Sequence, residues 1–279
     1  MYRTLDPLLS RAKREHLYRG LIFNGSLSSI NVCDTCGHGQ EIGKIEHGLI
    51  NLYYDRAYGA GAHVMPERYE DVSYFIHDSR AIGMYNFCTL DLDWTSVKSL
   101  LDVGAGPSHI SRYIRHHHPE VSLYAIEAGK PWLECYGRAG IELAALSFPV
   151  QLDRQFDLVI MSHSLEHFRD VVLVAEAVKD SVAPGKYLLI EVPHCPSVYF
   201  EMDLDDTPHL QFFTEQSLSL LLEPHGFKVI RSIVVGKELT TQPYLNGHAL
   251  QAEKAKASFE GNIPVQNGVY LRCLAQRIA

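Results

Sequence analysis

One segment, SLLDVGAGPSHISRYI at residues 99–114, constrains the fold of this chain more tightly than any other. An apolar run ends at Asp102, and Gly104 and Gly106 then allow a sharp turn and a close approach of the backbone to a ligand. Helical spacing follows, so the unpaired N–H groups at the start of a helix would lie beside the turn. A dinucleotide-binding loop carries a third glycine where this chain has His109. The segment therefore predicts a ligand-binding loop and leaves open which ligand it holds.

Apolar runs alternate with helical patterns after this segment begins. Runs that are apolar throughout indicate strands buried on both faces, as in a parallel sheet. The predicted strands are residues 97–103, 121–127, 140–146, 156–162 and 186–192. Valines at helical spacing from Val171 to Val182 predict one helix, and leucines after Thr214, a plausible N-cap, predict another. This alternation predicts an α/β protein with a doubly wound, Rossmann-like sheet.

The two ends of the chain depart from this alternation. Residues 227–235 and 268–278 are both strand-like, and they predict an antiparallel hairpin at the edge of the sheet. Residues 237–267, between these two strands, form a polar insertion in which a short surface helix is expected. The beginning of the chain lacks clear alternation, so we predict an N-terminal cap at residues 1–95 and the main domain at residues 96–279.

The composition indicates which cellular compartment and which classes of binding partner to expect. It is 46% hydrophobic and 21% charged, with a formal net charge of -8, which is ordinary for a globular protein. The acidic balance argues against a nucleic-acid partner, and the N-terminus has no apolar run long enough for a signal peptide or a membrane span. The cysteines are scattered, which favours a reducing compartment. We predict a cytoplasmic protein with no nucleic-acid or membrane partner, and the oligomeric state is left open.

Glu127, at the end of the second predicted strand, narrows the choice of ligand. A carboxylate at this place can accept hydrogen bonds from both hydroxyls of a ribose. Together with the glycine loop, it predicts a nucleoside with an anionic or zwitterionic tail. The third glycine of a dinucleotide site allows close packing around a pyrophosphate, so His109 favours a ligand without phosphates, such as S-adenosylmethionine.

Four segments in order resemble motifs of the class I S-adenosylmethionine-dependent methyltransferases. They are LLDVGAGPSHIS at 100–111, FDLVIMSHSLEHF at 156–168, VAPGKYLLIEVPH at 182–194 and PHLQFFTEQSLSLLLEPHGFKVI at 208–230. The leucine-glutamate-histidine after the fourth strand is similar to a subgroup that includes sugar and natural-product methyltransferases. The resemblance covers residues 97–235 and implies a seven-stranded sheet with the last strand antiparallel, in agreement with the predicted hairpin.

The resemblance also implies a set of cofactor-binding residues. They are Asp102, Gly104, Ala105 and Gly106 for the methionine end, Glu127 and Ala128 for the ribose, Ser147 for the adenine edge, and Ser162 and His163 beside the sulfonium.

Histidines on the expected rim of the site are the candidate catalytic residues. Methyl transfer from a sulfonium is an in-line displacement, so the protein mainly supplies alignment, and it supplies a base only where the acceptor must lose a proton. Histidine suits that task near neutral pH. We predict that His163, His194 and His209 contact the substrate or act as the base, whereas His167 is expected to be a structural hydrogen-bonding residue.

Cys33 and Cys36 form a C-x-x-C pair with the shape of a zinc knuckle. A structural zinc needs four ligands, commonly from two such pairs, and no cysteine precedes this pair. His16, His38 and His47 could complete a site, but their spacing is not standard. We therefore predict no metal site and keep zinc at this pair as an open alternative.

These observations predict an S-adenosylmethionine-dependent methyltransferase whose substrate is a small molecule: a sugar, a nucleotide sugar or a natural-product intermediate. The first alternative is a non-catalytic protein that binds S-adenosylmethionine. The second is an NAD(P)-dependent oxidoreductase, which shares the loop and Glu127. It is disfavoured because the third glycine and a hydride-site signature are missing.

Overall fold

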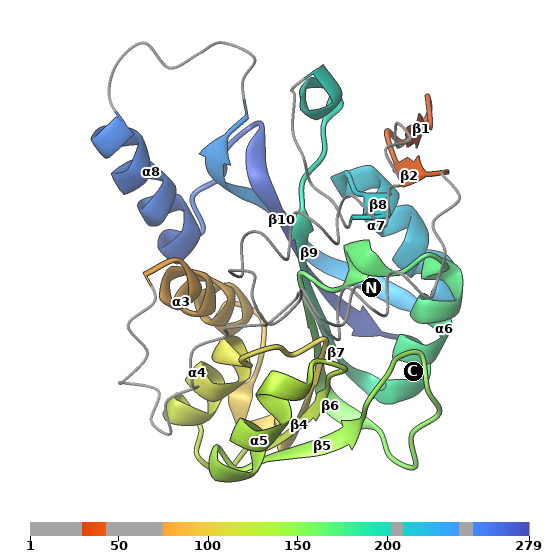
Figure 1. Cartoon of the computed structure of the whole chain (residues 1–279), viewed down its shortest axis with the longest axis vertical. Coiled ribbons are helices and arrows are strands. Elements are labelled where there is room, and N and C mark those ends of the chain that lie inside the picture. Colours follow the sequence, from red (N-terminus) through yellow and green to blue (C-terminus); the bar gives the residue numbers. More distant parts are fainter. Residues whose placement is uncertain (1–29, 43–74, 202–208, 240–247, 279) are drawn as a thin grey trace, which may run out of the picture.

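A seven-stranded sheet forms the centre of the computed structural model, which describes residues 30–42, 75–201, 209–239 and 248–278 (Figure 1). The strand order is β5-β4-β3-β6-β7-β10-β9. The strands are β3 (Ser99–Val103), β4 (Ser122–Ile126), β5 (Ile141–Ala145), β6 (Phe156–Ser162), β7 (Val182–Pro193), β9 (Phe227–Glu238) and β10 (Gly268–Arg277). Strands β3 to β7 pair in parallel, and β10 is antiparallel to both of its neighbours. The predicted fold class and the C-terminal hairpin are confirmed.

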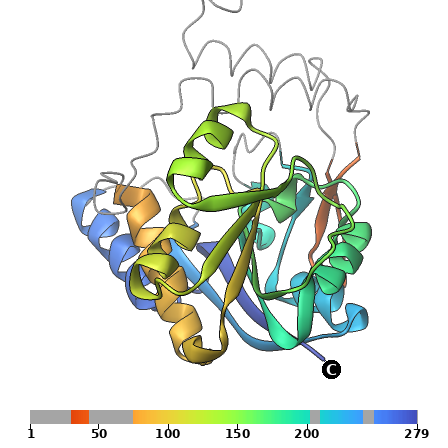
Figure 2. The same cartoon turned by 90° about the horizontal axis from the view of Figure 1, so that it is seen from below.

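Helices cover both faces of this sheet (Figure 2). Successive strand residues point to opposite faces, so Leu100 packs into one core and Leu101 into the other. The first core is closed by α3 (Phe75–Thr89), α4 (His109–His117) and α5 (Lys130–Arg138), and the second by α6 (Val171–Ser181) and α7 (Glu215–Leu222). Helix α8 (His248–Gly261), the helix expected in the insertion, packs on α3 and β9. Continuous apolar strands are therefore explained by burial on both sides.

Short elements and caps fix the ends of the helices. The 3-10 helices are η4 (Trp94–Ser96), η5 (Leu165–His167), η6 (Ser197–Glu201) and η7 (Glu223–His225). Thr214 caps α7 in a reciprocal pair with Ser217, as its position predicted. The end of α6 differs slightly from the expectation, because Val182 leaves the helix and pairs with Phe156 as the first residue of β7.

A second, three-stranded sheet contains β1 (Ile30–Val32), β2 (Gly39–Glu41) and β8 (Gln211–Phe212). The turn between β1 and β2 carries the cysteine pair, and Thr214 Oγ1 donates a hydrogen bond of 2.6 Å to the carbonyl of Cys36. This sheet therefore attaches the N-terminal segment to the start of α7.

The predicted boundary at residue 96 remains a prediction. Helix α3 lies before that boundary, and its buried Met84 and Phe87 belong to the first core. Much of the predicted cap, including His16 and His47, lies outside the described residues. No helix in the described part of the chain is long and apolar enough to cross a membrane.

Candidate functional site

The glycine turn after β3 requires glycine for steric reasons. Gly104 has a φ of +72°, and a Cβ at this position would lie 2.6 Å from the Cβ of Ser164. Gly106 also has a positive φ, of +49°, but a Cβ there would meet no atom within 4 Å. The backbone of the loop is thus held close to the segment after β6, and the space beside Gly106 is open.

Glu127 holds this loop from the end of β4. Its Oε2 accepts a hydrogen bond of 2.6 Å from the N–H of Gly106, and its Oε1 accepts one of the same length from the N–H of Gly129. The Tyr136 hydroxyl donates to the carbonyl of Gly106 at 2.6 Å. Each carboxylate oxygen can accept a second hydrogen bond, so Glu127 can fix the loop and still accept from a ligand hydroxyl.

Asp102 faces α4 instead of the open space. It is buried, and its Oδ2 accepts hydrogen bonds from the hydroxyls of Ser108 and Ser111 at 3.0 and 2.6 Å. Burial raises the pKa of Asp102 to about 6, although the two hydroxyls favour the charged form. Its structural effect is to tie the end of β3 to the first turn of the next helix.

A cavity of about 450 Å³ opens at the carboxyl ends of β3, β4 and β6. Of the predicted cofactor-binding residues, it is lined by Gly104, Glu127, Ala128, Ser147 and His163. Asp102, Ala105, Gly106 and Ser162 do not line it. Ligands of open α/β sheets bind at this end of the strands, so the cavity lies where the fold predicts a site.

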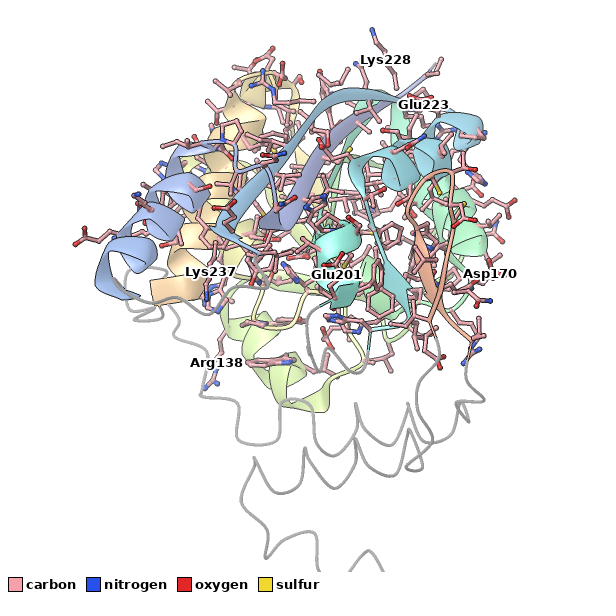
Figure 3. All side chains as sticks on the ribbon, turned by 90° about the horizontal axis from the view of Figure 1, so that it is seen from above. Arg138, Asp170, Glu201, Glu223, Lys228 and Lys237 are labelled. Atoms are coloured by element: carbon pink, nitrogen blue, oxygen red, sulfur yellow. The ribbon has the colours of Figure 1, made fainter. Side chains whose placement is uncertain are left out.

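Apolar side chains form most of the cavity wall. They are Val103, Ile126, Leu146, Phe148, Pro149, Phe168, Leu173, Val174 and Leu210. The polar part of the lining includes Asp170, labelled in Figure 3, which also caps α6 by accepting the N–H of Leu173 at 3.0 Å. A mostly apolar wall with few polar groups is typical of a small-molecule site.

His163 is fixed at the edge of the cavity by two buried carboxylates. Its Nδ1 lies 3.3 Å from Glu166 Oε1, and its Nε2 lies 3.3 Å from Glu191 Oε1. Its backbone has a φ of +52°, uncommon for a residue with a side chain, and its N–H donates to the carbonyl of Glu191 at 2.8 Å. The ring also packs edge-on against Tyr270.

Glu191 belongs to a buried charge network behind His163. Its carboxylate lies 2.5 Å from Nε of Arg272 and 2.9 Å from Nε of Arg80. Burial alone would raise the pKa of Glu191, but the two guanidinium groups and His163 outweigh it and lower the pKa to about 2. The two guanidinium groups thus compensate the buried charge of Glu191 and fix the carboxylate behind His163.

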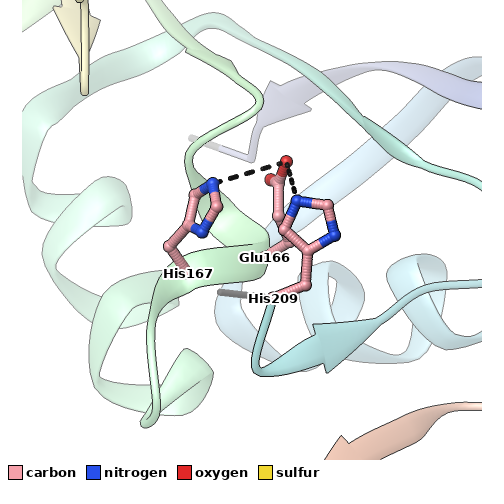
Figure 4. Close-up of side chains that lie close together, drawn as sticks. All are labelled: Glu166, His167 and His209. Atoms are coloured by element: carbon pink, nitrogen blue, oxygen red, sulfur yellow. Dashed lines mark ion pairs between the residues drawn. The ribbon is translucent and has the colours of Figure 1, made fainter. Parts of the chain in front are cut away.

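Glu166 lies beside three of the histidines considered in the sequence, and Figure 4 shows two of them, His167 and His209. Besides His163, the Nε2 atoms of His167 and His209 each lie 3.9 Å from its Oε1. Burial opposes ionisation of this carboxyl, but the nearby histidines outweigh it and lower its pKa to about 2. His167 also lines the cavity, so this cluster is adjacent to the proposed ligand space.

His194 lies apart from this cluster. It is 6% exposed, and its Nδ1 lies 3.0 Å from the carbonyl oxygen of Gly268. Burial lowers its pKa, which keeps the ring neutral. His194 does not line the cavity, so its position indicates a structural role at the end of β7.

The cysteine pair lies at or near the surface. Cys33 is exposed and Cys36 is half-buried. Nε2 of His38 pairs with Gln211 Oε1 at 2.9 Å, and its ring packs on Phe213. In the described ranges, the cysteines have no third histidine, cysteine or acid grouped with them at ligand distance.

Comparison with known proteins identifies the family. A model described as "Methyltransferase domain" matches residues 89–232, more than half of the chain. The chain belongs to the methyltransferase domain family. A search of curated proteins gives no significant match.

Solved structures agree with this methyltransferase fold. A chain from the complex of the Haloferax volcanii Trm112 methyltransferase activator with a methyltransferase has a TM-score of 0.53 at 10% identity, covering 72% of this chain and 92% of that one. An S-adenosylmethionine-dependent methyltransferase from Clostridium acetobutylicum has a TM-score of 0.50 at 11% identity. The match covers 75% of this chain and 94% of that one. The plantazolicin methyltransferase BpumL has a TM-score of 0.50 at 13% identity. The match covers 75% of this chain and 88% of that one. At these identities the likeness shows the fold.

Sequence reasoning missed several residues in and around the cavity. Ser164, against Gly104, and Phe148, in the cavity wall, carry no motif of their own. Glu166 belongs to the SLEHF segment, and an acid between His163 and His167 was a usable signal. Its importance depends on His209, which is distant in sequence and reaches it only in the folded chain.

Proposed function

We propose that this methyltransferase binds S-adenosylmethionine in the cavity at the ends of β3, β4 and β6 and transfers its methyl group to a small molecule. The observation that carries the proposal is the juxtaposition of Gly104 and Glu127 on neighbouring strand ends, in one cavity of a methyltransferase domain. The subgroup with the leucine-glutamate-histidine motif remains our prediction.

The residues present fit this cofactor. A cavity of about 450 Å³ is within the usual range for a small-molecule site. Leu146, Phe148 and Pro149 offer an apolar wall for an adenine ring, and Ser147 offers a hydroxyl among them. Glu127, which is 7% exposed, retains acceptor capacity for ribose hydroxyls.

When bound, the cofactor supplies a methyl group on a positively charged sulfur. The chain contributes alignment, because the glycine loop and Glu127 are fixed to each other before the ligand arrives. Glu166 and Glu191 orient the ring of His163, which lines the cavity and is our candidate for contact with the acceptor. His209 is a further candidate at the same edge, and the position of His194 disfavours such a contact.

A small-molecule acceptor is supported by the acidic net charge of -8 and by the mostly apolar wall of the cavity. Among proteins with this fold, the plantazolicin methyltransferase was solved with a pentazolic desmethyl analog of plantazolicin and S-adenosylhomocysteine. We propose an acceptor of similar kind, a natural-product intermediate or a sugar derivative.

The test is calorimetric titration of the full chain with S-adenosylmethionine, S-adenosylhomocysteine and NADH, followed by measurement of S-adenosylhomocysteine release with a panel of acceptors. We expect binding of the first two ligands, no binding of NADH, and release that depends on one acceptor class. Binding of NADH alone would reject the proposal, and cofactor binding without release for any acceptor would favour a non-catalytic protein.

A further inference from the structure

Glu166 is a fully buried carboxyl whose Oε1 lies within 3.3–3.9 Å of nitrogens of three histidines. Its side chain is 0% exposed, and neither carboxylate oxygen accepts a hydrogen bond of good geometry within the described chain. Its closest contact is the ion pair with Nδ1 of His163 at 3.3 Å. A buried carboxylate needs a compensating cation or a set of hydrogen bonds. The histidine nitrogens around Oε1 make no hydrogen bond of good geometry to it, so the carboxylate and the imidazoles are available to share a cation.

The groups around this carboxylate are of the types that bind transition-metal ions. One ligand atom each from Glu166, His167 and His209 can be chosen so that all three lie within 4.8 Å of one another. Ligand atoms around a tetrahedral zinc with bonds of about 2.0–2.1 Å lie about 3.4 Å apart. The separations of 3.9 Å between Oε1 and the two Nε2 atoms are close to that value, so small side-chain rotations complete a site.

The backbone holds the two contributing segments together. The N–H of Leu210 donates to the carbonyl of Glu166 at 2.8 Å, which places His209 beside η5. The side-chain amide of Gln211 donates to the carbonyls of Phe168 and Arg169 at 3.1 and 2.9 Å. The ligands are thus positioned by bonds that do not depend on an ion.

We propose that Glu166, His167 and His209 bind one divalent transition-metal ion, of the class of Zn²⁺ or Co²⁺. Two imidazoles and one carboxylate match this class better than Mg²⁺ or Ca²⁺, which prefer oxygen ligands. Nδ1 of His163 lies 3.3 Å from the same Oε1, so His163 orients this oxygen and is itself held by Glu191.

Three protein ligands leave coordination positions open, as in catalytic metal sites. His167 is shared between the metal cluster and the cavity wall, so the open positions lie next to the space for the acceptor. An oxygen or nitrogen of the acceptor can coordinate there and be held for methyl transfer. This use of the ion rests on the proposed function, whereas binding of the ion does not.

The test uses the untagged full chain after dialysis against a chelator. Zn²⁺ binding is measured by calorimetry and Co²⁺ binding by visible absorption, in the native chain and in Glu166→Gln and His209→Ala. We expect a single tight site in the native chain, weakened more than about tenfold in both variants. No tight site in the native chain, or unchanged affinity in both variants, would overturn the proposal.

Two controls locate the ion. His116 and His117 are exposed neighbours that could bind metal adventitiously, and Cys33 with Cys36 is the other candidate. The variants His116→Asn/His117→Asn and Cys33→Ser/Cys36→Ser should bind as the native chain does. Loss of binding in either control, with retention in Glu166→Gln, would place the ion elsewhere and overturn the proposal.

Thermal unfolding separates lost binding from lost folding. Saturating Zn²⁺ should raise the Tm of the native chain and both controls but not that of His209→Ala, because an ion stabilises only a state that binds it. An equal rise in His209→Ala would contradict the assignment. S-adenosylmethionine binding is measured on the same samples: its absence with metal bound rejects only the proposed function, and the reverse result rejects only the metal site.

Discussion

Arg272 and Glu191 form a fully buried ion pair across the junction of β10 and β7, with Nε and Oε2 separated by 2.5 Å. The two residues are register partners in adjacent antiparallel strands. Arg272 fixes the Glu191 carboxylate, and this carboxylate in turn holds the ring of His163 at the edge of the cavity. The position of His163 therefore depends on β10.

Arg272→Met should destabilise the protein by about 3–5 kcal/mol, because Glu191 then loses its closest buried partner. Urea unfolding at neutral pH measures this change. Lys256→Met, which removes the exposed partner of Glu260, is the matched control and should cost less than about 1 kcal/mol. Equal losses in the two variants would show that the buried pair has no special role.

Asp102→Asn should change how stability depends on pH. The folded pKa of Asp102, about 6, is above the ordinary value of 3.8, so its ionisation costs stability as the pH rises from about 4 to 6. The variant has no such charge, so its stability relative to the native chain should increase across that range by up to about 3 kcal/mol. Urea unfolding at several pH values tests this, and a constant difference would mean that the pKa of Asp102 is not raised.

Gly104→Ala should disrupt the loop, because the new Cβ would lie 2.6 Å from that of Ser164 and the backbone has a positive φ. We expect loss of S-adenosylmethionine binding, and partial recovery in Gly104→Ala/Ser164→Gly. Gly137→Ala is the control, since a Cβ there meets nothing within 4 Å. Calorimetry of all three variants measures the effect. Normal binding by Gly104→Ala would refute the loop assignment.

The features that could be predicted from the sequence are those that depend on residues close together in the chain. Continuous apolar runs predicted β3 and β6, and Gly104 with Glu127 predicted one end of the cavity. The partners of Glu191 could not be predicted, because the pairing with Arg272 depends on strand register. The contact of His209 with Glu166 likewise depends on chain segments that meet only after folding. His194 looked equivalent to His163 in sequence, but burial against Gly268 separates it from the cavity.

Calorimetric titration of Glu127→Ala with S-adenosylmethionine tests the central claim most directly. The substitution removes the acceptor of the Gly106 and Gly129 N–H groups as well as the proposed ribose contact. We predict a loss of about 1.5–3 kcal/mol, or roughly 10- to 150-fold in affinity, whereas the exposed Glu142→Ala should bind as the native chain does. Unchanged affinity in Glu127→Ala, or no binding by the native chain, would contradict the proposed cofactor site.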